Sequence, residues 1–204
     1  MRLAQVMGAL SADAGKPGAL VPAAAVLSCV VPALERPWKA ALSRTCTGRV
    51  LTVGPGLKTG MPVHYDDPAE IGPDRIADAV AARAVCGSPC IVIDLGTTTN
   101  IEVIDAHGTF VGGVIAPGLA LGARSLSAAA ARLPQVEPSA PTHVIGRNTR
   151  EAMRSGVVLG EVARIDGMLD MVLAEMRSTK AAGEGSVPIV ITGDDAEALA
   201  RSEE

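Results

Sequence analysis

Residues 91–113 constrain the fold most, because they alternate short β-branched runs with tight turns. The apolar run at 91–93 predicts a buried strand, and the segment after it, Asp94-Leu-Gly-Thr97, predicts a turn. Residues 100–104 predict a second strand, and a turn at 105–108 leads into a third strand at 109–115. The sequence therefore predicts an antiparallel meander with an acidic, glycine-bearing turn at its first corner.

This first corner has the residue types of a phosphate site. Gly96 has no Cβ, so backbone N–H groups can approach a phosphate closely, and the Thr97 and Thr98 hydroxyls add further donors. Asp94, at the end of a buried strand, is placed to hold a cation or an ordered water. The corner resembles the phosphate corner of actin, the heat-shock chaperone ATPases and the sugar kinases. The alternative is an ordinary hairpin with a Gly-Thr turn.

Composition excludes several classes of function. Hydrophobic residues make up 48% of the 204 residues, charged residues make up 20%, and the net charge is −4. Such a chain forms a core, and it has no basic cluster for nucleic acid or for an anionic membrane. No apolar run reaches the length of a membrane span, and the first ten residues do not form a convincing signal peptide. We expect a cytoplasmic protein with no nucleic-acid or membrane partner.

The four cysteines, Cys29, Cys46, Cys86 and Cys90, do not form a metal motif. Cys86 and Cys90 are separated by three residues, whereas a zinc knuckle or a redox pair has two. We therefore expect buried free thiols.

The rest of the chain alternates strands and helices, which indicates an α/β fold. Strands are expected at 25–31, 49–53 and 187–192, and helices at 1–10, 33–43, 76–83, 119–133 and 150–177. Asn148 or Thr149 is suited to cap the last of these helices. The long glycine- and proline-rich loop at 54–75 is more typical of a functional loop than of a simple connection.

Five motifs occur in a fixed order, and together they carry a resemblance. They are Gly54-Pro-Gly-Leu-Lys-Thr-Gly60, Tyr65-Asp-Asp-Pro68, Gly72-Pro-Asp-Arg75, Asp94-Leu-Gly-Thr97 and Ile145-Gly-Arg-Asn-Thr149. With these motifs the chain resembles a type III pantothenate kinase from about residue 25 to about residue 195. That family phosphorylates pantothenate with ATP in the first step of coenzyme A synthesis, and it uses Mg²⁺ and a monovalent cation, K⁺ or NH₄⁺.

The resemblance implies an actin-like ATPase (ribonuclease H-like) fold with two halves, and usually a homodimer. Residues 1–84 would form a partial N-terminal half with the substrate loop, and residues 85–204 the C-terminal half with the second phosphate turn. Family members open with an Asp-x-Gly-Asn-Thr loop that residues 1–90 do not contain. We therefore expect the N-terminal half to be incomplete.

The resemblance also implies roles for individual residues. Asp74 would be the general base, Asp94 would hold the monovalent cation, and Gly96 and Thr97 would contact ATP phosphate. The pantothenate-binding residues would be Tyr65, Gly72, Pro73, Arg75 and Thr149. Five of these residues have a structural alternative: Asp74 as a helix cap, Asp94 as an acceptor within its own turn, Arg75 in an ion pair, Tyr65 in the core and Thr149 as an N-cap.

Departures from the family pattern leave other functions open. Thr192-Gly193-Asp194 stands where the family has Thr-Gly-Gly near the nucleotide base, and it places a carboxylate close to an anionic ligand. A catalytically impaired homologue that binds pantothenate or a related ligand is one alternative. An interaction or structural protein that keeps only a dimer surface is another.

Overall fold

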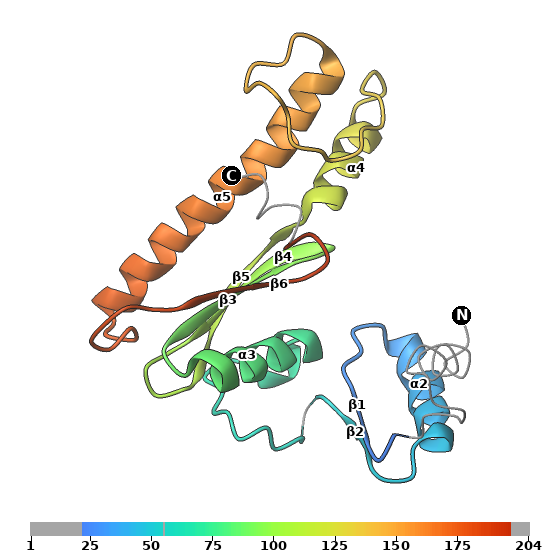
Figure 1. Ribbon diagram of the computed structural model, residues 1–204, viewed down its shortest axis with the longest axis vertical. Coiled ribbons are helices and arrows are strands. Elements are labelled where there is room, and N and C mark those ends of the chain that lie inside the picture. The colour runs from blue at the N-terminus through green and yellow to red at the C-terminus, as the bar shows by residue number, and fades with distance from the viewer. Residues whose placement is uncertain (1–21, 55, 197–204) are drawn as a thin grey trace, which may run out of the picture. The chain divides into compact units, whose positions relative to one another are not determined.

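The computed structural model describes residues 22–54 and 56–196 (Figure 1). The helix expected at residues 1–10 lies outside the described residues. The helices and strands are β1 Ala25–Leu27, α2 Pro32–Thr45, β2 Val50–Thr52, a 3₁₀ turn at Pro68–Glu70, α3 Pro73–Cys86, β3 Cys90–Leu95, β4 Thr98–Ile104, β5 Phe110–Pro117, α4 Leu119–Ala129, α5 Thr149–Ser178 and β6 Ile189–Thr192. The predicted mixed α/β class is confirmed.

The chain divides into two compact units. One comprises residues 1–60 and 67–77, and the other comprises residues 61–66 and 78–204. The predicted division into halves at residues 84 and 85 stays a prediction.

The larger unit contains a four-stranded sheet in the order β5-β4-β3-β6. β3, β4 and β5 form the predicted antiparallel meander, and β6 pairs with β3 in parallel. The second turn is held by Asp105, whose Oδ1 accepts the backbone N–H groups of His107 at 2.9 Å and Thr109 at 2.8 Å. These turn residues match the pattern in the sequence because turn chemistry is local.

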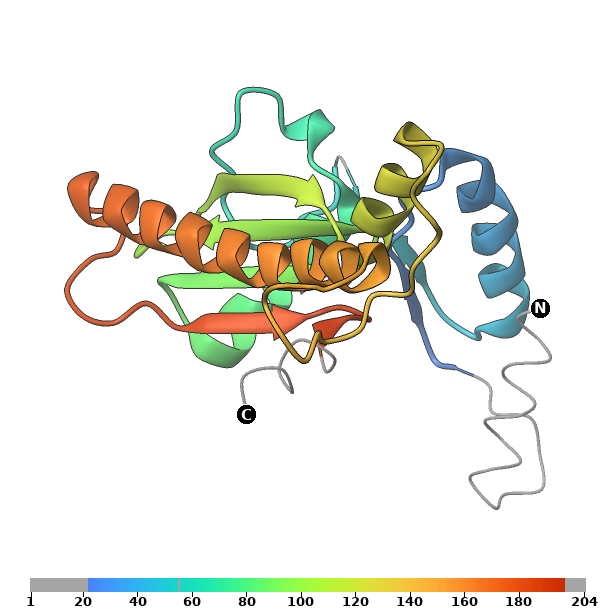
Figure 2. The ribbon, with the colours of Figure 1, turned by 90° about the horizontal axis from the view of Figure 1, so that it is seen from above.

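Helix α5, 30 residues long, covers one face of this sheet (Figure 2). The cross-strand pairs Ile91–Val103 and Ile93–Ile101 lie on this face, because alternate residues of a strand point the same way. They pack against Met176 and Val158 of α5 in two neighbouring hydrophobic clusters. Burial of these β-branched side chains fixes the register of the meander.

Helices α4 and α5 lie side by side next to the sheet (Figure 1). Ala123 of α4, Met153 of α5 and Val136 of the connecting loop form a third cluster. Helix α4 ends at Ala129, four residues before the predicted end. The predicted long helix is confirmed, with Asn148 as its N-cap: its Oδ1 accepts the Glu151 N–H at 3.0 Å.

The smaller unit contains β1 and β2, which pair in parallel, and helix α2. The prediction of a buried strand at 25–31 is wrong in length and in burial. The strand ends at Leu27, and Val26 is 66% exposed. Strand β1 pairs with β2 alone among the described strands, so it lacks the neighbours on both sides that bury β3 and β4.

The prediction of buried thiols holds for Cys90 but is wrong for Cys86, which is exposed at the end of α3. Cys29 and Cys46 are half-buried. Burial raises the pKa of the Cys90 thiol, the nearby Cys86 raises it further, and Arg83 acts in the opposite direction. A raised pKa lowers the fraction of thiolate, which is the reactive form.

We therefore expect iodoacetamide at pH 8 to modify Cys86 before Cys90. Peptide mass spectrometry of the folded chain would show carbamidomethylation at Cys86, with Cys90 modified only after denaturation. Equal rates at the two thiols would contradict the burial of Cys90.

None of the helices in the described part of the chain combines the length and apolar character needed to span a membrane.

Candidate functional site

The start of α3 brings together Gly72, Pro73, Asp74 and Arg75. Asp74 is half-buried, and its Oδ1 accepts the backbone N–H of Arg75 at 2.9 Å. A Cβ on Gly72 would lie only 2.3 Å from this oxygen, so glycine leaves room for the carboxylate. Pro73 is the first residue of the helix, where its missing N–H costs nothing. The Gly-Pro pair therefore begins the helix at Pro73, three residues before the expected start at residue 76, and places Asp74 in the first helical turn.

Arg75 is only 6% exposed, although it follows directly after the loop. Burying a guanidinium is costly unless acceptors surround it, so a buried arginine is held in one defined position. A fixed fork of N–H donors suits a carboxylate or a phosphoryl group.

Tyr65 packs on the beginning of β5. Its ring centroid lies 6.1 Å from that of Phe110, and a Cβ on Gly112 would lie 3.9 Å from its Cε2. The preceding segment runs beside β5, because Phe110 donates its N–H to Pro62 at 2.9 Å and His64 donates its N–H to Phe110 at 2.8 Å. Tyr65 is half-buried, so it is not the fully buried core aromatic that was the structural alternative.

The first meander turn connects β3 to β4 through Gly96 and Thr97. Asp94 is half-buried near the end of β3, and Thr97 is exposed. The N–H of Gly96 donates to the carbonyl of Thr98 at 3.1 Å within the turn. This N–H is thus engaged within the turn, and the approach of a phosphate to the backbone at Gly96 stays a prediction. The nearest atom to a Cβ on Gly96 would be the carbonyl oxygen of Thr98 at 4.0 Å, an ordinary van der Waals distance, so this side of Gly96 is not crowded.

Two further glycines lie close to this turn. The sequence did not indicate either of them as a site residue. A Cβ on Gly118 would lie 2.1 Å from the carbonyl oxygen of Gly96, and one on Gly193 would lie 2.6 Å from Asp94 Oδ1. Gly118 also donates its N–H to the carbonyl of Thr97 at 3.1 Å. In Thr192-Gly193-Asp194 the glycine therefore lies against the turn, while Asp194 is exposed.

Polar side chains follow Asp94 on the sheet face opposite α5. Asp94 pairs in register with Asn100, and Glu102 lies two residues further along the same face of β4. Asn100 is 4% exposed and Glu102 is 0% exposed. Asn100 Oδ1 has no hydrogen-bond partner among the described residues. The period-2 spacing of Asn100 and Glu102 was the signal in the sequence that could have identified them.

Thr149 is the first residue of α5 and is exposed. Asn148 caps the helix, and Glu151 Oε2 accepts the Arg147 N–H at 3.0 Å. Thr149 is therefore not the N-cap, which was its structural alternative.

The structure thus brings Asp94, Gly96 and Thr97 together in one corner, and Gly72, Pro73, Asp74 and Arg75 together at a helix start. Glu161 of α5 contacts β4 beside the corner, and Thr149 lies twelve residues earlier in the same helix, which is about 18 Å along its axis. The corner and Thr149 are therefore separate within this unit.

The comparison with known families identifies the family of the chain. A family model described as type III pantothenate kinase matches residues 2–171. The chain belongs to the type III pantothenate kinase family. Residues 65–149, which hold every candidate site residue, lie inside the match.

Curated relatives carry the same name. The chain is 44% identical over 168 residues to the type III pantothenate kinase of Koribacter versatilis (strain Ellin345), a match that covers 82% of this chain and 59% of the relative. It is 43% identical over 152 residues to that of Shouchella clausii (strain KSM-K16), covering 74% of this chain and 59% of the relative. The chain thus spans about three fifths of the length of these relatives.

A solved structure has a similar fold. It is described as a conserved Baf family transcriptional activator from Campylobacter jejuni, with a TM-score of 0.52 and 21% identity, over 84% of this chain and 68% of that one. At this identity the likeness concerns the fold alone.

Proposed function

We propose that this chain phosphorylates pantothenate at its primary hydroxyl with ATP, as the first step of coenzyme A synthesis. The observation that carries the proposal is the family match over residues 2–171. The curated relatives that are 43–44% identical and named type III pantothenate kinase support it.

The wider architecture forms part of the proposal. We propose an actin-like fold in two halves, residues 1–84 and 85–204. A homodimer and a cytoplasmic location complete the proposal. The family resemblance is the support for each of these statements.

Asp74 is proposed as the general base that accepts the proton of the pantothenate hydroxyl. Its Oδ1 is occupied by the Arg75 N–H, which orients the carboxylate and leaves Oδ2 for the substrate. A carboxylate held in this way can accept a proton from a substrate hydroxyl that lies within hydrogen-bond reach.

Pantothenate itself is proposed to contact Tyr65, Gly72, Pro73, Arg75 and Thr149. The buried Arg75 guanidinium would bind the carboxylate of pantothenate or the transferred phosphoryl group. The exposed hydroxyl of Thr149 would contribute a hydrogen bond, and in a homodimer it could do so to the partner's substrate.

The nucleotide is proposed to bind at the β3–β4 turn, through the Thr97 hydroxyl and the open surface at Gly96. Asp94 would hold the monovalent cation, K⁺ or NH₄⁺. The corner fits a hard cation, because the half-buried Asp94 carboxylate pairs in register with Asn100, whose buried Oδ1 lacks a hydrogen-bond partner among the described residues. When bound, MgATP supplies the phosphoryl group, with Mg²⁺ neutralising its charge.

The direct test is incubation of the purified chain with pantothenate, MgATP and K⁺ or NH₄⁺. We expect 4′-phosphopantothenate by mass spectrometry and ADP release that depends on pantothenate. Replacing K⁺ with Na⁺ should lower the rate if a monovalent cation binds at Asp94. Pantothenate binding without turnover would overturn the proposal and favour the impaired homologue, and loss of both would favour an interaction protein.

A further inference from the structure

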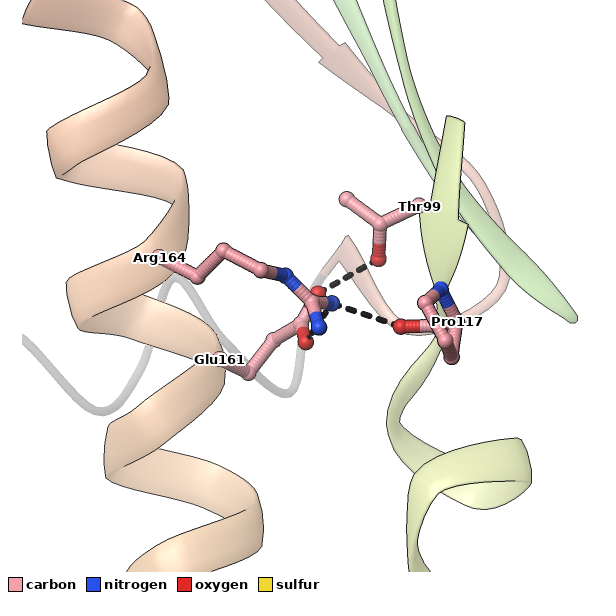
Figure 3. A network of polar contacts seen from close by, with 4 residues as sticks. All are labelled: Thr99, Pro117, Glu161 and Arg164. Atoms are coloured by element: carbon pink, nitrogen blue, oxygen red, sulfur yellow. Dashed lines mark hydrogen bonds and ion pairs between the residues drawn. The ribbon is translucent and has the colours of Figure 1, made fainter. Parts of the chain in front are cut away.

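The carboxylate of Glu161 connects α5 to the strands that flank the Gly96–Thr97 turn (Figure 3). Thr99 Oγ1 donates a hydrogen bond to Glu161 Oε1 at 2.5 Å, and Arg164 Nη2 forms an ion pair with Glu161 Oε2. Arg164 Nη2 also donates to the carbonyl oxygen of Pro117 at 2.6 Å. One helix thereby contacts the beginning of β4 and the end of β5.

Packing alone does not account for a carboxylate at this position. Glu161 is 5% exposed, and its neighbours on α5, Val158, Val162 and Ile165, pack in a hydrophobic cluster with Ile93 and Leu95. The Arg164 side chain is 35% exposed, but the carboxylate of Glu161 is desolvated at a cost, and apolar residues of similar size often stabilise a core at least as well. Such a pair is therefore better explained by the geometry that it imposes than by stability.

The two contacts hold the Gly96–Thr97 turn from both sides. Thr99 pairs in register with Leu95, directly next to the turn. Pro117 precedes Gly118, whose N–H donates to the carbonyl of Thr97 at 3.1 Å. Glu161 thus fixes the β4 side of the turn through Thr99, and Arg164 fixes the opposite side through Pro117.

We propose that Glu161 and Arg164 are positioning residues for nucleotide binding, which set the orientation of the Thr97 hydroxyl towards a phosphate. The inference rests on the proposed function, because it assumes that the turn binds the phosphates of a nucleotide. It assigns a role to residues of α5 that are not themselves ligands.

Thr99→Val and Glu161→Gln test this role. Valine keeps the volume of threonine but removes the donor, while glutamine cannot accept from both Thr99 and Arg164. We expect each to weaken binding of a fluorescent ATP analogue and to raise KM for MgATP by about tenfold or more, as for outer-shell partners of a ligand. KM for pantothenate should change less than twofold. Thr99→Ser keeps the hydroxyl and should therefore retain the nucleotide affinity of the wild-type chain.

Asp105→Ala is the matched control for a general loss of stability. It removes two hydrogen bonds from the turn at the opposite end of β4, so it should lower Tm while leaving nucleotide affinity unchanged. Suppose that the wild-type chain binds nucleotide and phosphorylates pantothenate. Unchanged nucleotide binding in Thr99→Val and Glu161→Gln would then overturn this inference but not the proposed function. Equal loss of nucleotide and pantothenate affinity would also overturn it. A wild-type chain that binds no nucleotide would overturn the proposed function together with the inference.

Discussion

Asp74→Asn is expected to lower kcat for pantothenate phosphorylation by about 10²–10⁴-fold, the usual contribution of a positioned general base. Asparagine can still accept the Arg75 N–H through its side-chain oxygen, so the start of α3 should keep its structure. The amide cannot accept the hydroxyl proton, so only the chemical step should be lost. The measurements are ADP release for kcat, calorimetry for pantothenate affinity, and Tm.

The control is Glu70→Gln, which neutralises an exposed acid in the 3₁₀ turn just before α3. It should leave kcat and Tm unchanged. If Asp74→Asn retained more than a tenth of the wild-type kcat, another group would have to be the base. A fall in Tm with weaker pantothenate binding would instead assign Asp74 to capping the helix.

Local chemistry explains what could be predicted from the sequence. The β3–β5 meander follows from alternating apolar residues and turn residues, and helix α3 was expected, although it starts at Pro73 rather than at residue 76. The sequence indicated Asn148 or Thr149 as the N-cap of α5. In the structure Asn148 is the N-cap, because its side-chain oxygen accepts the Glu151 N–H. In each case the interacting groups lie within a few residues of one another.

Long-range contacts explain what was missed. Thr99 and Glu161 are 62 residues apart in the chain, and no local pattern marks a glutamate on an apolar helix face as the partner of a threonine. The closeness of Gly118 and Gly193 to the turn likewise depends on the pairing of β4 with β5 and of β3 with β6. The apolar run at residues 25–31 predicted burial for β1. Burial depends on neighbouring strands, which a local run does not specify.

Gly118→Ala is expected to destabilise the protein and to weaken nucleotide binding together. The added Cβ would lie 2.1 Å from the carbonyl oxygen of Gly96 and 2.9 Å from that of Thr97. Both are backbone atoms, so no side-chain rotation relieves the clash, and either the turn or the start of α4 must move. We expect a loss of about 3 kcal/mol, the upper part of the usual range for overpacking, and a fall in Tm of about 6–12 °C.

Gly122→Ala is the matched control, because it makes the same change one helical turn later. A Cβ on Gly122 meets nothing within 4 Å, and the residue lies inside α4 with its N–H donated to Gly118 at 2.8 Å. Alanine should therefore stabilise the helix by about 0.5–1 kcal/mol and leave KM for MgATP unchanged. If Gly118→Ala matched this control in Tm and in KM, the close approach of Gly118 to the Gly96–Thr97 turn would not exist in solution. A fall in Tm with unchanged nucleotide affinity would separate the packing of Gly118 from the geometry of the turn, and would count against nucleotide binding at Gly96 and Thr97.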